Sequence, residues 1–210
     1  MSSRHDAESL GARLARAFGR APRPVRQDGR GHRLIAVIEC ILNQNARDAG
    51  AASFRSMVDD VVRLCEEHGV GLLQMPCPEI AYLGPERARE RGESIRDALD
   101  TPGGRLRCAD IASDVADRIE AYVRAGYDVV AVLGGNPKSP GCAVNASAEG
   151  LLRSSGILMQ ALEVELGRRD IAIPFRGIRD ADPAALAEDV AWLRAVLAGE
   201  ARAGARTVQA

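Results

Sequence analysis

Five cysteines are the residues of this chain best suited to chemistry, and they fall into two groups. Cys40, Cys77 and Cys142 each follow a short apolar run, whereas Cys65 and Cys108 lie within or at the start of amphipathic segments. Thiolates bind metals and act as nucleophiles, and a reducing compartment disfavours disulfides. We therefore expect the first group to form a functional site and the second group to be buried in the core.

The residues around the first group narrow the choice of metal. None of the three histidines falls in the segments that follow the apolar runs, and the chain has no CxxC pair. Structural zinc sites normally use such pairs and four protein ligands. Three thiolates with one open position suit instead a [4Fe-4S] cluster whose fourth iron can bind a soft donor such as sulfur. The sequence thus predicts a cluster held by Cys40, Cys77 and Cys142, with ordinary buried cysteines as the alternative.

The elements that must position these cysteines alternate regularly from Arg33 onward. Short apolar runs predict buried strands and amphipathic segments predict helices, an alternation typical of a parallel sheet covered by helices. We expect strands at 34–40, 70–77, 128–135 and 171–175, and helices at 53–69, 84–100, 109–125, 150–167 and 183–198. The predicted fold class is α/β, a three-layer Rossmann-like or flavodoxin-like fold with a mostly parallel sheet of about four strands.

Particular residues mark the expected helix ends. Ser53 is placed to be the N-cap of the first helix and Gly69 the residue that ends it. Asp182 and Pro183 form an N-cap and first-turn pair for the last helix.

The strand ends predict where the chemistry takes place. Cys40 closes the first expected strand, Cys77 closes the second, and Cys142 follows the third by one short loop. In a doubly wound sheet, ligands bind outside the carboxyl ends of the strands, at the point where the strand order reverses. We therefore expect the three thiols to meet in one crevice.

Length and composition indicate one folded domain. The chain has 210 residues, of which 46% are hydrophobic, enough for a sizeable core. We expect a flexible arm over 1–32, a single α/β domain over 33–198 and a disordered tail over 199–210.

Charge and hydropathy exclude several partners. A net charge of -1 and a pI near 6.3 provide no field that would attract polymeric nucleic acid or an anionic membrane. The chain shows neither an apolar run of roughly 20 residues, as a membrane span needs, nor a secretory signal. We therefore expect a cytoplasmic protein.

Four motifs resemble the thiouracil desulfidase-like family. They are CILNQNARDAG (40–50), PCPE (76–79), KSPGC (138–142) and GILMQAL (156–162). The likeness is greater to the branch of that family with LNQN after the first cysteine, and it covers about residues 33–178. It implies a [4Fe-4S]-dependent desulfidase that removes sulfur from a small thiocarbonyl compound, such as a thiolated nucleobase, and releases sulfide without net redox change.

The resemblance also implies that water attacks the thiocarbonyl carbon, which requires a proton acceptor and a donor. Glu79 and Ser139 are the polar side chains tied to the cysteine motifs. Glu79 is expected to be the general base or proton relay, and Ser139 to hydrogen-bond or protonate the substrate. The alternatives are that Glu79 caps a backbone turn and that Ser139 is a turn residue before Pro140.

Three further residues are candidates for substrate binding. Asn45 could pair with the edge of a base, and Arg47 could orient a carbonyl or carboxylate. Lys138, the one lysine of the chain, could also balance the negative charge of a thiolate-bound cluster. The alternatives are a turn residue for Asn45 and solvated charges for the other two.

The chain departs from the family pattern at three positions. It has SPGCA where the family usually has SPSCG, so Gly141 lacks a hydroxyl and Ala143 replaces a flexible turn residue. Glu39 precedes the first cysteine where relatives are expected to have a histidine or a small residue. These departures are compatible with cluster binding and bear on which substrate is used. Three other functions remain open: a cluster-based sulfur carrier or sulfur-insertion protein, a non-enzymatic iron-sulfur redox sensor, and a cluster-free thiol enzyme.

Overall fold

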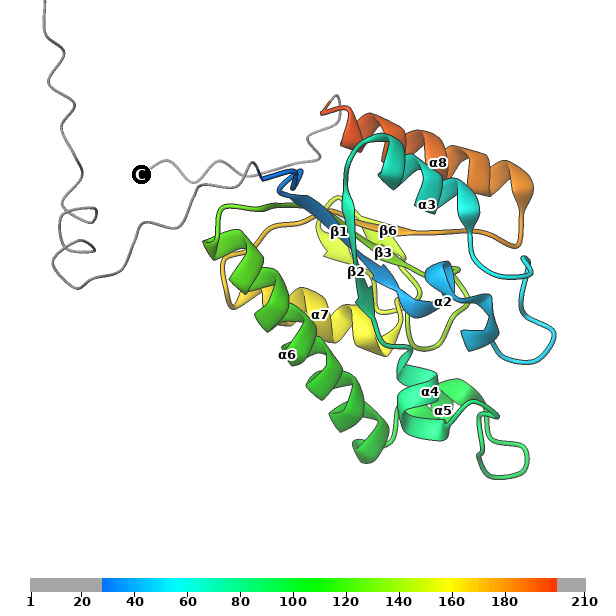
Figure 1. Ribbon diagram of the computed structural model, residues 1–210. Helices are drawn as coiled ribbons and strands as arrows, with labels where there is room; N and C mark the ends of the chain where they lie inside the picture. Colours follow the sequence, from blue (N-terminus) through cyan, green and yellow to red (C-terminus); the bar gives the residue numbers. More distant parts are fainter. Residues whose placement is uncertain (1–27, 200–210) are drawn as a thin grey trace, which may run out of the picture. The chain divides into compact units, whose positions relative to one another are not determined.

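A four-stranded parallel sheet lies at the centre of the structure, a computed structural model that describes residues 28–199 (Figure 1). Its strands are β1 (Arg33–Ile38), β2 (Gly71–Met75), β3 (Asp128–Gly134) and β6 (Phe175–Gly177). They lie in the order β2-β1-β3-β6, and every neighbouring pair is parallel. This order is that of the flavodoxin-like doubly wound fold. The predicted α/β fold class is therefore confirmed.

Helices cover both faces of the sheet and complete the three layers (Figure 1). One face carries α3 (Asp59–Glu67) and α8 (Pro183–Leu197), and the other carries α6 (Pro102–Arg124) and α7 (Ile157–Gly167). Among the helices of residues 28–199, none combines the length and the apolar character that crossing a membrane requires. The predicted arm over 1–32 and tail over 199–210 fall almost entirely outside the described residues.

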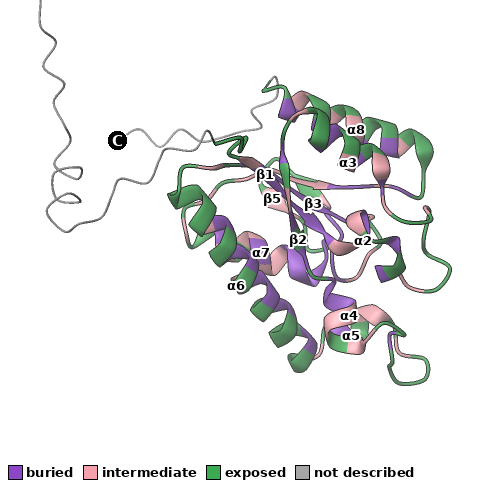
Figure 2. Ribbon diagram, in the orientation of Figure 1, coloured by how far each residue is buried: buried purple, intermediate pink, exposed green. Residues whose placement is uncertain are grey.

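The core follows the inner strands. In β1, every residue from Leu34 to Ile38 is buried, and β3 is buried over most of its length (Figure 2). A strand with helices on both faces has no solvent side, so its sequence is an apolar run without alternation. That property explains why LIAVI and VVAVL could be recognised as strands.

The first predicted helix, over 53–69, is shorter in the structure, where α3 begins at Asp59. The expectation that Ser53 is its N-cap was therefore wrong. The backbone N–H of Ser53 donates a 3.0 Å hydrogen bond to the side-chain Oε1 of Gln44, which holds this segment against the loop after β1. The predicted end at Gly69 is confirmed, since its φ of +63° is the left-handed conformation that ends a helix.

The predicted helix over 84–100 is confirmed only near its end, where α5 (Ile95–Leu99) lies. A short helix that was not predicted, α4 (Pro78–Leu83), precedes this range, and turns and irregular backbone connect the two. Beyond them α6 begins at Pro102, well before the predicted start at 109, because the side chain of Thr101 accepts from the Gly104 N–H and caps the helix.

The region after β3 contains a hairpin that the sequence did not predict. Residues 150–151 form β5 (Gly150–Leu151), which pairs with β4 (Ala146–Ser147), so α7 begins at Ile157 rather than at 150.

The last predicted strand, 171–175, starts only at its final residue, Phe175. The residue before it is proline, which has no N–H to donate to a sheet. At the last helix, the Asp182 side chain accepts from the Ala184 N–H at 2.9 Å, so the predicted cap and its Pro183 are confirmed.

Candidate functional site

A cleft of about 850 Å³ opens at the carboxyl ends of the strands, and Cys40, Cys77 and Cys142 all line it. Cys40 lies in α2 (Glu39–Leu42), directly after β1, and Cys77 is the N-cap of α4, two residues after β2. Cys142 lies in the loop that follows β3. The structure thus brings the three predicted cysteines together at the edge of the sheet where the connections reverse.

The connections between strands change from one face of the sheet to the other around β1. The chain passes from β1 to β2 over one face of the sheet through α3, and from β2 to β3 over the other face through α6. Loops that leave neighbouring strands toward opposite faces open a crevice between them. The three cysteine loops come from β1, β2 and β3, which are the three strands at this point.

Two of the thiols interact directly. A hydrogen bond from Cys142, helped by the positive charge of Arg47, holds the pKa of Cys40 below its ordinary value of 9.0. The same pairing, together with burial, raises the pKa of Cys142 well above that value. The pairing therefore favours loss of the proton from Cys40 over loss of the proton from Cys142.

Cys77 stands in a different environment. Burial raises the pKa of its thiol to about 11. Arg87 donates an N–H to its Sγ at 3.8 Å, and the backbone N–H of Cys77 donates to Oε2 of Glu39 at 2.8 Å. A carboxylate from the end of β1 therefore fixes the cysteine at the end of β2.

The two predicted catalytic side chains meet beside Cys142. The Ser139 hydroxyl lies 3.0 Å from the Cys142 Sγ and donates to Oε1 of Glu79 at 3.4 Å. The Cys142 backbone N–H in turn donates to the Ser139 Oγ at 3.3 Å. Both side chains line the cleft, so a carboxylate, a hydroxyl and a thiol form one continuous polar chain along its wall.

Two glycines permit this close approach. A Cβ at position 135 would sit 2.7 Å from the Sγ of Cys142, and a Cβ at position 141 would sit 2.5 Å from Cγ of Pro78. Gly141 is therefore favoured for a steric reason, because any larger residue would push the Cys142 loop away from the Cys77 loop. Gly135 explains the GG pair at the end of β3.

The three predicted substrate-binding residues occupy different places. Arg47 lines the cleft, its Nη2 donates to Oδ2 of Asp180 at 2.6 Å, and its Nε is buried without a hydrogen-bond partner. Lys138 also lines the cleft and is exposed. Asn45 is not among the lining residues, and its side-chain amide donates to Oδ1 of Asn43 at 2.9 Å. The turn alternative therefore describes Asn45 better.

Sequence reasoning missed a buried carboxylate that joins three loops. Asp180, just beyond β6, accepts hydrogen bonds from Arg47 at 2.6 Å, from Asn136 at 2.6 Å and from Gln44 at 3.1 Å. Its side chain is fully buried. Asp180 stands in the run RDAD, which has the composition of any polar turn, so the sequence contained no signal for this role.

Arg87 and Glu39 were also missed as parts of the site. The side chain of Arg87 is only 1% exposed and pairs with Glu79 at 3.3 Å. It belongs to the polar run ERARER, in which nothing distinguishes it from Arg89 or Arg91. The one sequence signal for a role of Glu39 was its unusual position directly before the first cysteine.

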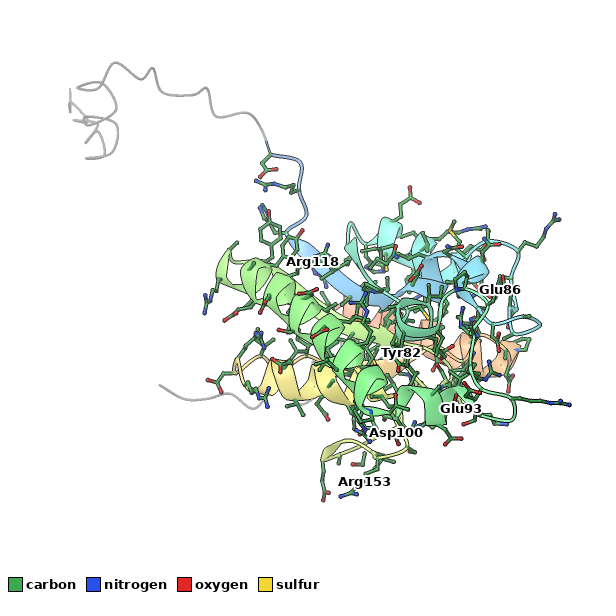
Figure 3. The ribbon with its side chains drawn as sticks, turned by 90° about the horizontal axis from the view of Figure 1, so that it is seen from below. Tyr82, Glu86, Glu93, Asp100, Arg118 and Arg153 are labelled. Carbon is green, nitrogen blue, oxygen red and sulfur yellow. The ribbon has the colours of Figure 1, made fainter. Side chains whose placement is uncertain are left out.

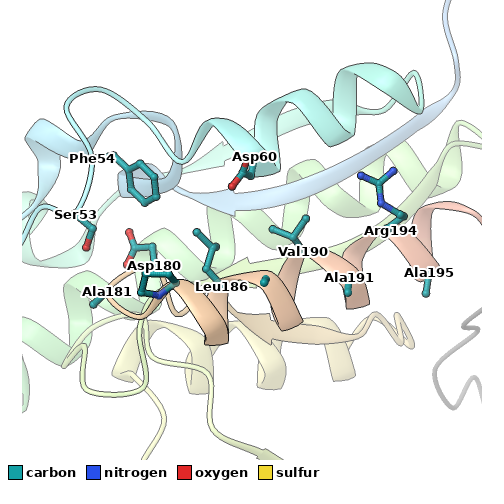
Figure 4. A pocket seen from close by; sticks show the side chains of 12 residues that line it. Ser53, Phe54, Asp60, Asp180, Ala181, Leu186, Val190, Ala191, Arg194 and Ala195 are labelled. Atoms are coloured by element: carbon teal, nitrogen blue, oxygen red, sulfur yellow. The ribbon is translucent and has the colours of Figure 1, made fainter.

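A second hollow of about 880 Å³ lies between α3 and α8 (Figure 4). Its walls are mainly apolar, with Phe54, Leu186 and Val190 projecting toward it and Arg194 at one end. No cysteine lines it. The cysteine cleft is therefore the candidate functional site.

The donor set of the cleft consists of three cysteine thiols, the donor type that iron-sulfur clusters use. Within residues 28–199, no group of three or more His, Cys, Asp and Glu side chains is placed to hold one metal ion. The three thiols lie on three separate loops around the cleft, and those of Cys40 and Cys142 are close enough to share a hydrogen bond.

Comparisons with known proteins give one distant likeness. An uncharacterized protein of Methanocaldococcus jannaschii is 26% identical over 144 residues, which are 69% of this chain and 84% of the relative. No protein family matches the chain by its sequence profile, and no solved structure matches it. The similarity to the archaeal protein spans most of both chains but carries no activity with it.

Proposed function

We propose that the protein is a [4Fe-4S]-dependent desulfidase, acting in the cytoplasm on a small thiocarbonyl compound such as a thiolated nucleobase. The observation that carries this proposal is the convergence of Cys40, Cys77 and Cys142 on the cleft that Glu79 and Ser139 also line. The three cysteines would hold the cluster, which when bound supplies an open iron as a Lewis acid for the substrate's sulfur.

The remaining chemistry falls to side chains. The net reaction converts C=S and water into C=O and hydrogen sulfide, so no electrons are transferred and only protons must move. The Glu79 carboxylate accepts a proton from the attacking water, and the Ser139 hydroxyl hydrogen-bonds the substrate next to the reacting carbon. Their separation of 3.4 Å lets a proton pass between them.

Charged side chains in the cleft wall would orient the substrate. Because Asp180 holds one end of the Arg47 guanidinium, its planar fork faces the cleft in a fixed position and can align a carbonyl or carboxylate. Lys138, which is exposed, supplies a second positive charge for a substrate anion. A small planar heterocycle with polar edges is therefore the substrate class proposed here.

The first test is anaerobic iron and sulfide analysis of the purified and reconstituted protein, with a visible spectrum. We expect about four irons per chain and a broad band at about 400 nm, as for a thiolate-bound cluster. Cys40→Ala, Cys77→Ala and Cys142→Ala should each lose the cluster, whereas Cys65→Ala should keep it. A wild-type protein that stays metal-free after reconstitution would refute the proposal.

The second test measures sulfide release from 2-thiouracil and 4-thiouracil. Release by the reconstituted protein that Glu79→Gln abolishes would support the desulfidase. A stable cluster without turnover would favour a redox sensor, and sulfur gain by an activated acceptor would favour a sulfur-insertion protein. Activity that survives chelation and air would point to a cluster-free thiol enzyme.

A further inference from the structure

Arg87 is a buried cation in an otherwise exposed segment. Its side chain is 1% exposed, whereas Glu86, Arg89 and Arg91 are exposed. Figure 3 labels Glu86 and Glu93 on the same stretch between α4 and α5. Burial of a guanidinium is costly unless the charge is paired and its N–H groups are hydrogen-bonded. The placement of Arg87 therefore needs strong compensating contacts.

Those contacts reach two of the three cysteine loops. Nη2 donates to the Ala46 carbonyl at 2.5 Å, in the loop after Cys40, and lies 3.8 Å from the Cys77 Sγ. Nε donates to Oε2 of Glu79 at 3.3 Å. The guanidinium also donates from Nη1 to the Pro85 carbonyl at 2.8 Å, which closes its own turn. One planar group thus connects the loop after β1 to the loop after β2.

The same contacts determine how Glu79 is presented. Oε2 of its carboxylate is occupied by Arg87, and Oε1 receives the Ser139 hydroxyl at 3.4 Å. A carboxylate held at one oxygen by a rigid donor has a defined orientation for the other oxygen. Without Arg87 the Glu79 side chain would be free to rotate away from Ser139.

We propose that Arg87 is a positioning residue, which directs Glu79 toward Ser139 and holds the Cys40 and Cys77 loops together at the cleft. The part that concerns Glu79 rests on the proposed desulfidase function, and the part that concerns the loops does not. Lysine could not replace it, because an ammonium is a point charge whereas the fork of arginine donates in several fixed directions at once.

Two variants separate the charge of Arg87 from its geometry: Arg87→Lys keeps the charge without the planar fork, and Arg87→Met removes both. Arg91→Met is a matched control from the exposed part of the segment. The first measurement is hydrogen exchange of the metal-free full chain, followed on peptides that cover 40–50 and 76–89. We expect both Arg87 variants to exchange roughly tenfold faster in these peptides, the factor that corresponds to one lost charge-assisted hydrogen bond. Arg91→Met should exchange like the wild type.

The second measurement uses the reconstituted protein. Iron transfer to a chelator, followed at about 400 nm, should be roughly tenfold faster in both Arg87 variants than in the control. With a thiolated pyrimidine as substrate, kcat should fall roughly tenfold to a hundredfold while KM stays within about twofold, because catalytic orientation is lost and not binding.

The outcomes distinguish this proposal from the proposed function. If exchange and iron loss in both Arg87 variants match Arg91→Met, Arg87 is only a packing residue and the inference is overturned. Full recovery of all three readouts by Arg87→Lys would also overturn it, because charge without the fork would then suffice. If Arg87→Met does not fold, the comparison of Arg87→Lys with Arg91→Met tests the proposal alone. If the wild type binds no cluster, the desulfidase proposal fails while hydrogen exchange still tests the link between the loops.

Discussion

Oε2 of Glu39 accepts a 2.8 Å hydrogen bond from the backbone N–H of Cys77. The two residues are far apart in sequence, but they follow adjacent strands, so the carboxylate joins the loop after β1 to the loop after β2. Glu39 immediately precedes Cys40 and therefore couples two of the proposed ligands directly. This contact gives a structural reason for an acidic residue directly before Cys40.

Removal of this contact should weaken the site. In Glu39→Ala the Cys77 N–H, which is partly buried, loses its acceptor at a cost of about 1–3 kcal/mol. We expect the free energy of unfolding to fall by that amount in urea denaturation, and iron retention after reconstitution to fall with it. Glu39→Gln keeps an acceptor oxygen and should retain most of both. Equal losses in the two variants would show that the charge of Glu39, and not its hydrogen bond, is what matters.

The buried carboxylate of Asp180 should be among the most sensitive positions. Its side chain is fully buried and that of Arg47 is 13% exposed, so loss of the charge removes the carboxylate partner of a nearly buried guanidinium. We expect Asp180→Asn to destabilise the fold by about 3–5 kcal/mol. The control is Asp59→Asn, which breaks an exposed i,i+4 pair with Arg63 and should cost less than about 1 kcal/mol. Similar values for the two variants in urea denaturation would contradict the assigned role.

The role of Gly141 can be tested by substitution with serine and with alanine. A Cβ there would meet Cγ of Pro78 at 2.5 Å, so Gly141→Ser and Gly141→Ala should force the loops apart and cost about 1–3 kcal/mol. Gly167 has open space around its Cα, and Gly167→Ala is the control. Thermal unfolding compares the variants. A stable Gly141→Ser protein with unchanged iron content would show that the loops tolerate the added atoms.

The sequence predicted the parallel sheet and the convergence of the cysteines because both follow from local signals. Buried parallel strands are continuous apolar runs, and each strand end carries its cysteine into the same edge of the sheet. It could not predict that α3 begins only at Asp59, because the segment before it is tied to the loop after β1, as by the hydrogen bond from the Ser53 N–H to the Gln44 side chain. Likewise Arg87 and Arg91 are identical in type, and only the tertiary fold buries one of them.

Cys65 and Cys108, the two cysteines outside the site, should make the stability of the fold depend on pH. Burial raises the pKa of both Cys65 and Cys108 from 9.0 to about 11. Between pH 9 and pH 11 the two thiols keep their protons in the folded protein, whereas in the unfolded chain they release them. The contribution of the two buried thiols to the free energy of unfolding is therefore fully present below pH 9 and is lost as the pH rises toward 11. Each thiol contributes roughly 3 kcal/mol across that window. We expect the free energy of unfolding of wild-type protein, measured in urea under reducing conditions, to fall more steeply from pH 8.5 to 11 than that of a Cys65→Ala/Cys108→Ala double variant. Parallel curves would show that burial does not raise the pKa of these thiols.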